Sequence, residues 1–190
     1  MKTLYLLAGC NGAGKTTAAY ALLPGLLDCR EFVNADEIAR GLSPFQPETV
    51  SVQAGRLMLA RLRELLAAGE TFALETTLAT RHYLRFIAEA RERGYFVSLL
   101  FFWLNSPDLA VGRVKLRVQE GGHSIPEDVI RRRYIGGLQQ FFTAYCTAVD
   151  SWTFMDNSNG AAQLVASSAD GETQVVNEDI WQQLRVTYHV

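Results

Sequence analysis

The chain has 190 residues, a formal net charge of −2 and 48% apolar residues. This length is enough for one domain with a full three-layer core, and no apolar run approaches the ~20 residues of a membrane-spanning helix. The net negative charge excludes the overall positive field that draws many proteins to nucleic acid. We therefore expect a single domain, residues 1–190, without a membrane segment or a nucleic-acid partner.

The first ten residues superficially resemble a short signal that ends in a lipidated cysteine. Their apolar segment, residues 4–8, is shorter than the core of about 7–15 residues in a secretory signal. The chain has three cysteines, an odd number without metal-ligand spacing. These features favour a reduced protein that stays in the cytoplasm.

A strand is predicted at residues 3–8, and the segment 9–16 directly behind it has the sequence Gly-Cys-Asn-Gly-Ala-Gly-Lys-Thr. It fits the pattern of phosphate-binding loops, Gly-x-x-x-x-Gly-Lys-Ser/Thr, and an apolar helix is predicted from Thr17 onwards. Glycines let successive N–H groups turn towards a polyphosphate, and the helix N-terminus adds its positive end. Lys15 is expected to reach the β- and γ-phosphates, and the Thr16 hydroxyl to ligate Mg²⁺. The predicted nucleotide-binding residues are Gly9, Asn11, Gly12, Ala13, Gly14, Lys15, Thr16 and Thr17.

Strands and helices alternate along the rest of the chain. Apolar periodicity predicts further strands at 31–34, 71–75, 96–104 and 152–155, and helices at 48–68, 80–93, 107–120 and 126–149. A C-terminal extension, residues 162–190, is predicted to form a β-hairpin with an Asp-Gly turn and a final helix at 178–187. This order implies an α/β fold of the P-loop NTPase, nucleotide-kinase-like type, with a mainly parallel sheet covered on both faces.

Two helix starts carry recognisable capping patterns. Ser106 before Pro107 is typical of an N-cap followed by proline in the first turn, and Ser124 with Glu127 fits a capping box.

Because ligands bind beyond the carboxyl ends of parallel strands, the segments at those ends are the candidate sites. They are the phosphate loop and residues 34–36, 75–77, 105–106 and 156–158.

Two carboxylates follow predicted strands. Asp36 can orient an acceptor hydroxyl and take its proton, or it can simply be the N-cap of the short helix after it. Glu75, followed by Thr76 and Thr77, can hold a second substrate or a water on Mg²⁺, or cap a helix near Thr80. A functional role is favoured for Glu75 because a charge that ends a buried strand needs a partner.

Fifteen of the 18 basic residues are arginines, and five of them stand in the segment 113–133. They are Arg113, Arg117, Arg131, Arg132 and Arg133. The loop between the two predicted helices contains two glycines and suits a mobile lid, from which Arg117 and one or two later arginines can close over a transferring phosphate. A solvated basic helix face is the alternative for at least two of the five. His123 is expected to be a histidine of a surface turn.

Several short segments behind the phosphate loop together resemble the zeta-toxin-like P-loop kinases, over about residues 3–160. They are Asn-Ala-Asp-Glu-Ile-Ala at 34–39, Glu-Thr-Thr-Leu at 75–78, Gly-Gly-His-Ser-Ile-Pro at 121–126, Arg-Arg-Arg-Tyr at 131–134 and Asp-Asn-Ser at 156–158. The resemblance implies a phosphotransferase that uses ATP or GTP with Mg²⁺. Zeta toxins phosphorylate the 3′-hydroxyl of UDP-N-acetylglucosamine and are restrained by an antitoxin protein, so a sugar-nucleotide acceptor and an antitoxin partner are implied too.

The resemblance also implies roles for individual residues. Asp36 becomes the general base, and Glu75 and Thr77 contact the sugar nucleotide. Lys15 and Arg117, with Arg131 or Arg132, become the catalytic cations around the phosphate. Larger toxins of the family carry an arginine two residues after the threonine, where this chain has Ala79. Arg81, two positions later, is therefore assigned to the acceptor site together with Asn34.

The residues disfavour two other classes of function. A nucleotide-driven switch or motor is disfavoured, because the chain has no Asn-Lys-x-Asp guanine-binding motif and no strand that ends in paired acidic residues. A kinase acting on nucleic-acid ends is permitted by the local arginines. The net negative charge and the absence of a wider basic region in the sequence argue against it.

Overall fold

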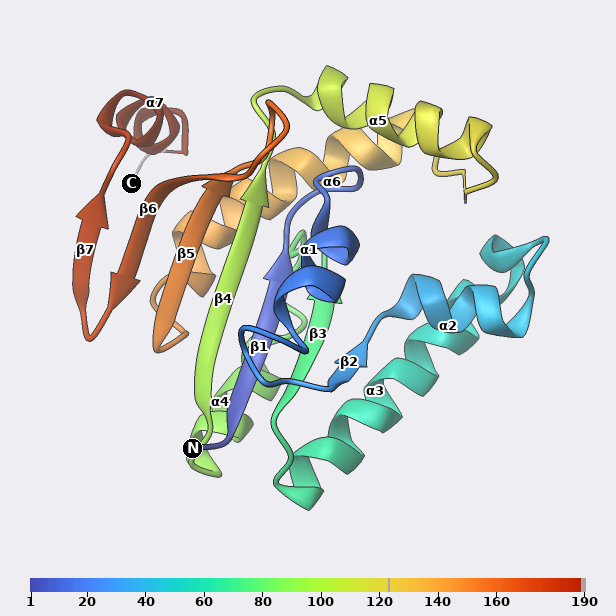
Figure 1. Cartoon of the computed structure of the whole chain (residues 1–190), viewed down its shortest axis with the longest axis horizontal. Helices are drawn as coiled ribbons and strands as arrows, with labels where there is room; N and C mark the ends of the chain where they lie inside the picture. The colour runs from blue at the N-terminus through green and yellow to red at the C-terminus, as the bar shows by residue number, and fades with distance from the viewer. Residues whose placement is uncertain (123, 189–190) are drawn as a thin grey trace.

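The computed structural model describes residues 1–122 and 124–188 (Figure 1). His123, expected in a surface turn, lies outside the described residues. Seven strands form one sheet in the order β2-β3-β1-β4-β5-β6-β7. The strands are β1 (Thr3–Ala8), β2 (Glu31–Val33), β3 (Phe72–Thr76), β4 (Phe96–Trp103), β5 (Ser151–Asp156), β6 (Gln163–Ala169) and β7 (Glu172–Val175). The strands from β2 to β5 pair in parallel, and β6 and β7 add antiparallel pairs at one edge.

Helices cover both faces of this sheet. They are α1 (Lys15–Leu22), α2 (Ala35–Leu42), α3 (Ser51–Ala68), α4 (Leu84–Glu92), α5 (Pro107–Gln119), α6 (Glu127–Gln140) and α7 (Glu178–Tyr188). Two short elements adjoin these helices. The 3₁₀ turn η1 (Pro47–Val50) precedes α3, and the short π-helix η2 (Phe141–Tyr145) follows α6. Figure 1 shows α1 in front of the sheet and α4 and α6 behind it. The predicted α/β fold with a mainly parallel sheet is confirmed.

The central strands are buried on both faces, which explains their nearly continuous apolar sequences. Leu4, Leu6 and Leu7 of β1 are fully buried, as are Phe72 and Leu74 of β3. In this parallel register Leu7 lies opposite Glu75, so the carboxyl end of β3 stands beside the start of the phosphate loop. Among the helices of the described residues, none is both long and apolar enough to cross a membrane.

Three predicted helices have different bounds in the structure. The helix expected at 48–68 begins at Ser51, after the 3₁₀ turn η1. The helix expected at 80–93 begins only at Leu84, because the Tyr145 hydroxyl donates to the Thr80 carbonyl at 2.7 Å and accepts from the Tyr83 N–H at 3.4 Å. These long-range hydrogen bonds hold residues 80–83 in turns. The helix expected at 126–149 ends at Gln140 and passes into the short π-helix η2.

One of the two predicted helix caps is correct. The Ser106 hydroxyl accepts from the Leu109 N–H at 3.2 Å, with Pro107 in the first turn of α5. The capping box at Ser124 is wrong, since α6 starts two residues later than that pattern requires, with Pro126 as its N-cap. The Glu127 side chain instead pairs with Lys115 and Arg131.

The C-terminal extension continues the sheet and the core. Strands β6 and β7 form the predicted hairpin with its turn at Asp170 and Gly171, and α7 follows as expected. Trp181 of α7 stacks on Trp152 of β5 with ring centroids 5.3 Å apart, and it also contacts Phe142 and Phe154. The last helix therefore closes one end of an aromatic cluster rather than standing apart.

Candidate functional site

The phosphate loop joins β1 to α1 with a backbone that only glycine adopts easily. Gly9 has φ +136°, and a Cβ there would clash with the Phe102 carbonyl oxygen of β4. Gly14, the N-cap of α1, has φ +85°, and its Cβ would lie 2.5 Å from Asn157 Nδ2. Glycine at both positions lets the loop run against the sheet end while the N-terminus of α1 faces outwards.

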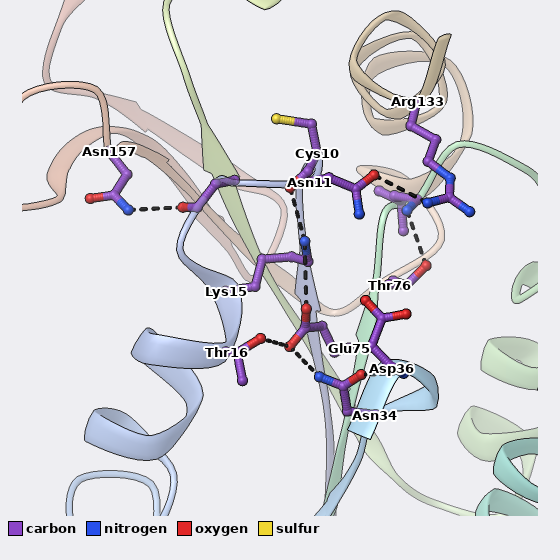
Figure 2. Close-up of polar contacts among 12 residues, drawn as sticks. Cys10, Asn11, Lys15, Thr16, Asn34, Asp36, Glu75, Thr76, Arg133 and Asn157 are labelled. Atoms are coloured by element: carbon purple, nitrogen blue, oxygen red, sulfur yellow. Dashed lines mark hydrogen bonds and ion pairs between the residues drawn. The ribbon is translucent and has the colours of Figure 1, made fainter. Parts of the chain in front are cut away.

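Polar side chains behind this loop form one connected group (Figure 2). Lys15 is buried, donates to the Cys10 carbonyl at 2.9 Å and lies 3.5 Å from Glu75 Oε1. Glu75 Oε2 accepts from the Thr16 hydroxyl at 2.8 Å and from Asn34 Nδ2 at 2.9 Å. The end of β3 thus places a carboxylate against the lysine and threonine of the motif. Glu75 does not cap a helix.

Three side chains from distant parts of the chain hold the outer side of the loop. Asn157, just beyond β5, donates to the Ala13 carbonyl at 2.8 Å. Arg133 of α6 donates to Asn11 Oδ1 at 3.2 Å, as Figure 2 shows. Arg113 of α5 donates to the Gly12 carbonyl at 3.5 Å and to the Ser158 carbonyl at 2.9 Å. Strand β5 and helices α5 and α6 therefore all fix the conformation of the loop.

A cavity of about 1320 Å³ opens beside the phosphate loop. One wall is formed by Asn11, Gly12, Gly14, Lys15, Thr16 and Thr17. A second wall comes from the segment 36–48, and a third from Arg113, Arg117 and the loop that ends α5. This volume is large enough for a nucleotide and a second small molecule.

Asp36 lines the cavity from the first turn of α2. It is not the N-cap, because Asn34 takes that position and accepts from the Asp36 N–H at 2.8 Å. The Asp36 carboxylate makes no hydrogen bond or ion pair with any other residue of the part that the structure describes. A carboxylate at a cavity wall, free to accept a proton, suits the role of a general base.

The structure brings to this cavity only some of the residues predicted for the acceptor site and for the cations around the phosphate. Asp36, Glu75 and Arg117 line it, whereas Asn34 is buried behind it. Gly9 and Ala13 belong to the loop but do not line the cavity. Thr77, Arg81, Arg131 and Arg132 are not among its lining residues either. Arg81 lies on another surface, where it donates to Gln140 at 3.1 Å.

The later arginines differ from the expectation as well. Arg131 pairs with Glu127 at 2.7 Å and with Asp108 at 2.6 Å, and Arg132 is exposed. Arg133, for which the sequence predicts no separate role, is the one that reaches the phosphate loop. Arg113 and Asn157 are predicted from the sequence only as members of larger candidate groups, and no role is predicted for Phe45, the aromatic residue of the second wall. The prolines around Phe45 were the only local signal for that wall.

The glycines of the expected lid end helix α5. Gly122 N–H donates to the Arg117 carbonyl at 2.8 Å and Gly121 N–H to the Val118 carbonyl at 3.0 Å, the two hydrogen bonds of a Schellman motif. This motif turns the chain back over the cavity and fixes the end of the helix that carries Arg117. Movement of the segment 113–133 as a lid stays a prediction.

The residues around the metal position fit Mg²⁺. The Thr16 hydroxyl and a Glu75 carboxylate oxygen lie 2.8 Å apart at the N-terminus of α1, and both are hard oxygen ligands. No group of three or more His, Cys, Asp or Glu that could hold a metal occurs within residues 1–122 and 124–188. This arrangement suits an ion that takes one or two protein ligands and completes its shell with phosphate oxygens and water.

A comparison with protein families places the chain. The model of a family described as an AAA domain (AAA_33) matches residues 4–134, which span the phosphate loop, Asp36, Glu75 and most of α6. The chain belongs to this AAA domain family. An uncharacterised protein of Haemophilus influenzae is 31% identical to this chain over 127 residues. The matched residues cover 66% of this chain and 88% of that relative.

Solved structures with a similar fold include two complexes. A chain of the AvrRxo1-ORF1:AvrRxo1-ORF2 complex with sulphate ions has a TM-score of 0.81 at 19% sequence identity, and the match covers 97% of the present chain. The present chain spans only 63% of the AvrRxo1 chain, which is less than two thirds of that neighbour's length. A chain of the PezAT toxin–antitoxin system of Streptococcus pneumoniae has a TM-score of 0.71 at 18% identity, over 97% of this chain and 78% of its own. The expected zeta-toxin-like resemblance is thus confirmed at the level of the fold.

Proposed function

We propose that the protein is a kinase that transfers the γ-phosphate of ATP to a hydroxyl group of a small molecule. The observation that carries this proposal is the unpaired Asp36 carboxylate in the same cavity as Lys15 and Thr16 of the phosphate loop. A carboxylate at that place can take the proton of an acceptor hydroxyl that attacks the γ-phosphate. The same AvrRxo1 neighbour has also been crystallised with ATP, at a TM-score of 0.78, which supports ATP as the donor.

The proposed reaction needs few protein groups. The acceptor oxygen attacks the γ-phosphorus and forms a new O–P bond, while the bond from the γ-phosphorus to the bridging oxygen breaks and leaves its electron pair on ADP. Asp36 takes the acceptor proton. Lys15 and Arg117 neutralise negative charge that develops on the phosphoryl oxygens. The products are ADP, the phosphorylated acceptor and one proton.

The Thr16 hydroxyl would ligate Mg²⁺, and Glu75 would orient a water on it. When bound, the metal neutralises charge on the β- and γ-phosphate oxygens. Glu75 is hydrogen-bonded to both Thr16 and Asn34, so its orientation is set before any ligand arrives. We therefore assign Glu75 to the metal side of the cavity rather than to the sugar nucleotide.

The resemblance to zeta-toxin-like kinases carries two finer expectations. It implies UDP-N-acetylglucosamine as acceptor, and it implies an antitoxin as protein partner. The similarity of fold to the PezAT toxin–antitoxin chain supports the second expectation. Growth arrest on expression of the chain alone, relieved by the product of the neighbouring reading frame, would test it.

The decisive experiment compares Asp36→Asn with Asp128→Asn. Both aspartates occupy the same position in the first turn of a helix, but only Asp36 lines the cavity. With Mg-ATP and a bacterial metabolite extract, we expect Asp36→Asn to lower phosphoryl transfer, followed by mass spectrometry, by about 10²–10⁴-fold. Its dissociation constant for ATP should stay near the wild-type value. Asp128→Asn should behave like the wild type in both measurements.

Three outcomes would contradict the proposal or parts of it. Retained transfer by Asp36→Asn would exclude Asp36 as the base. Slow ATP hydrolysis without any phosphorylated small molecule would favour a nucleotide-driven switch. Transfer confined to 5′-hydroxyl oligonucleotides would favour a nucleic-acid end kinase.

A further inference from the structure

The second wall of the cavity, residues 36–48, carries more acidic than basic side chains. Asp36, Glu37 and Glu48 line the cavity there, and Arg40 is the cation of that wall. Arg40 lies 3.5 Å from Glu37, its neighbour on the same helix face. The wall therefore has an excess of negative charge, and its guanidinium already faces a carboxylate.

The cations lie on the donor side of the cavity. Lys15 belongs to the phosphate loop, and Arg113 and Arg117 come from α5. Of the four cations among the described residues that line the cavity, three thus lie on the side of the phosphate loop, together with Glu75 and Glu120, while the wall that carries Asp36 has three carboxylates and one guanidinium. Like charges on wall and ligand oppose binding, so a phosphate-bearing acceptor would meet repulsion there.

An aromatic ring is presented at the same wall. Phe45 is 98% exposed and lines the cavity between Pro44 and Pro47, which line it too. Proline fixes φ and restricts the residue before it, so the two prolines limit the conformations in which this segment can carry the ring. A fully exposed phenylalanine at a cavity wall offers apolar area that a planar or apolar ligand face can cover.

We propose that the acceptor is a ring-bearing alcohol without phosphate groups, either uncharged or cationic, whose ring packs on Phe45. This inference rests on the proposed kinase function and specifies the substrate class of the same site. It departs from the sugar nucleotide implied by the family resemblance, because the wall offers no cation free of a carboxylate for a diphosphate. Arg81, assigned to that task from the sequence, lies outside the cavity with Gln140.

The chemical step is the one already described. The acceptor hydroxyl attacks the γ-phosphorus, its proton passes to Asp36, and ADP leaves with the electron pair of the broken O–P bond. An acceptor without phosphates brings no additional negative charge to a site that already holds those of ATP.

The first test separates acceptors by charge. A bacterial metabolite extract is passed over an anion-exchange resin at neutral pH, and the unretained and retained fractions are each incubated with the protein and Mg-ATP. We expect the phosphorylated product, found by mass spectrometry, from the unretained fraction. Matched pairs such as N-acetylglucosamine with UDP-N-acetylglucosamine, and uridine with UMP, serve as defined probes.

The outcomes separate the two proposals. A product formed only from the retained, phosphate-bearing fraction overturns the acceptor assignment and leaves the kinase function standing. No product from either fraction, although the protein binds ATP, contradicts the kinase function, and the acceptor assignment falls with it. A preference of at least about tenfold in kcat/KM for the unphosphorylated member of a pair supports the assignment; the reverse preference opposes it.

The second test uses Phe45. With the acceptor found above, Phe45→Ala should raise the acceptor KM about five- to tenfold and leave the KM for ATP within about twofold. Phe45→Tyr keeps the ring and should keep the lower acceptor KM. Leu26→Ala, at another exposed apolar residue outside the cavity, is the matched control. An unchanged acceptor KM in Phe45→Ala would exclude the ring contact.

Discussion

Three consecutive arginines of α6 meet three different surroundings. Arg131 pairs with carboxylates of α5 and α6, Arg132 faces solvent, and Arg133 donates to Asn11 of the phosphate loop. Successive side chains of an α-helix point about 100° apart, so only one of three neighbours can face a given loop. The sequence predicts that one or two of these arginines lie near the phosphate, but the rotation of α6 decides which one reaches the phosphate loop.

We predict that Arg133→Met raises the KM for ATP about three- to tenfold, because Asn11 loses the donor that orients it. Arg132→Met, one residue earlier and exposed, is the control and should leave this KM within about twofold of the wild type. Steady-state kinetics across a range of ATP concentrations checks both variants. A larger effect at Arg132 than at Arg133 would favour Arg132 as an arginine that acts on the phosphate, as the family resemblance implies.

The cysteines allow a prediction about reactivity and pH. Burial raises the pKa of the Cys10 and Cys29 thiols to about 11, and burial also raises that of Cys146. Since the thiolate is the reactive form, only about one Cys10 or Cys29 in 1,000 is ionised at pH 8. We expect iodoacetamide to alkylate Cys10 and Cys29 slowly at pH 8 and faster at higher pH. Intact-mass measurement over time follows the alkylation. Rapid modification of Cys10 in the folded protein would contradict this description of the loop.

At the scale of elements, α6 lies against the segment that follows β3. A Cβ on Gly137 would lie 2.7 Å from the Thr77 carbonyl oxygen, and one on Gly136 would lie 3.2 Å from the Ala79 carbonyl oxygen. These two glycines let the helix approach closely enough for Arg133, one turn earlier, to reach Asn11. Close packing of this kind connects the strand that carries Glu75 with the helix that carries Arg133.

We predict that Gly137→Ala destabilises the protein by about 1–3 kcal/mol, because backbone must move to admit the methyl group. Gly55→Ala in α3 is the matched control, since nothing lies within 4 Å of a Cβ there. That variant should be neutral or stabilising by up to about 1 kcal/mol. Urea denaturation of both variants measures the difference; equal stabilities would show that α6 adjusts without cost.

Most elements were predictable because their patterns are local. The five parallel strands and the C-terminal hairpin lie within one or two residues of their expected bounds, and Asp-Gly does form the hairpin turn. The delayed start of α4 was not predictable, because it depends on hydrogen bonds from Tyr145, 62 and 65 residues away along the chain. The same holds for Ser124, whose capping pattern is satisfied in sequence but not in space.

At the scale of the whole molecule, one aromatic cluster joins β5, η2 and α7. Phe142 and Trp152 both contact Trp181, and Phe142 stacks on Tyr188. Strand β5 also leads directly to Asn157, which holds the phosphate loop. The C-terminal hairpin and helix therefore support the strand that positions one side of the site.

We predict that Trp181→Ala lowers the free energy of unfolding by about 3–5 kcal/mol and the melting temperature by roughly 10 °C. Val186→Ala changes an exposed residue of the same helix and should shift stability by less than about 0.5 kcal/mol. Thermal melts followed by circular dichroism compare the two. A melting temperature unchanged in Trp181→Ala would show that the extension is independent of the core.

The sequence by itself determined the order of strands and helices, the phosphate loop and the parallel sheet. Apolar periodicity and glycine spacing act over a few residues, so these features can be inferred without knowing the packing. The tertiary structure alone placed Glu75 against Lys15 and Thr16, chose Arg133 over its neighbours and brought the segment 36–48 to the same cavity as the phosphate loop. Those contacts join residues up to 122 positions apart, and they depend on how helices rotate and pack against one sheet.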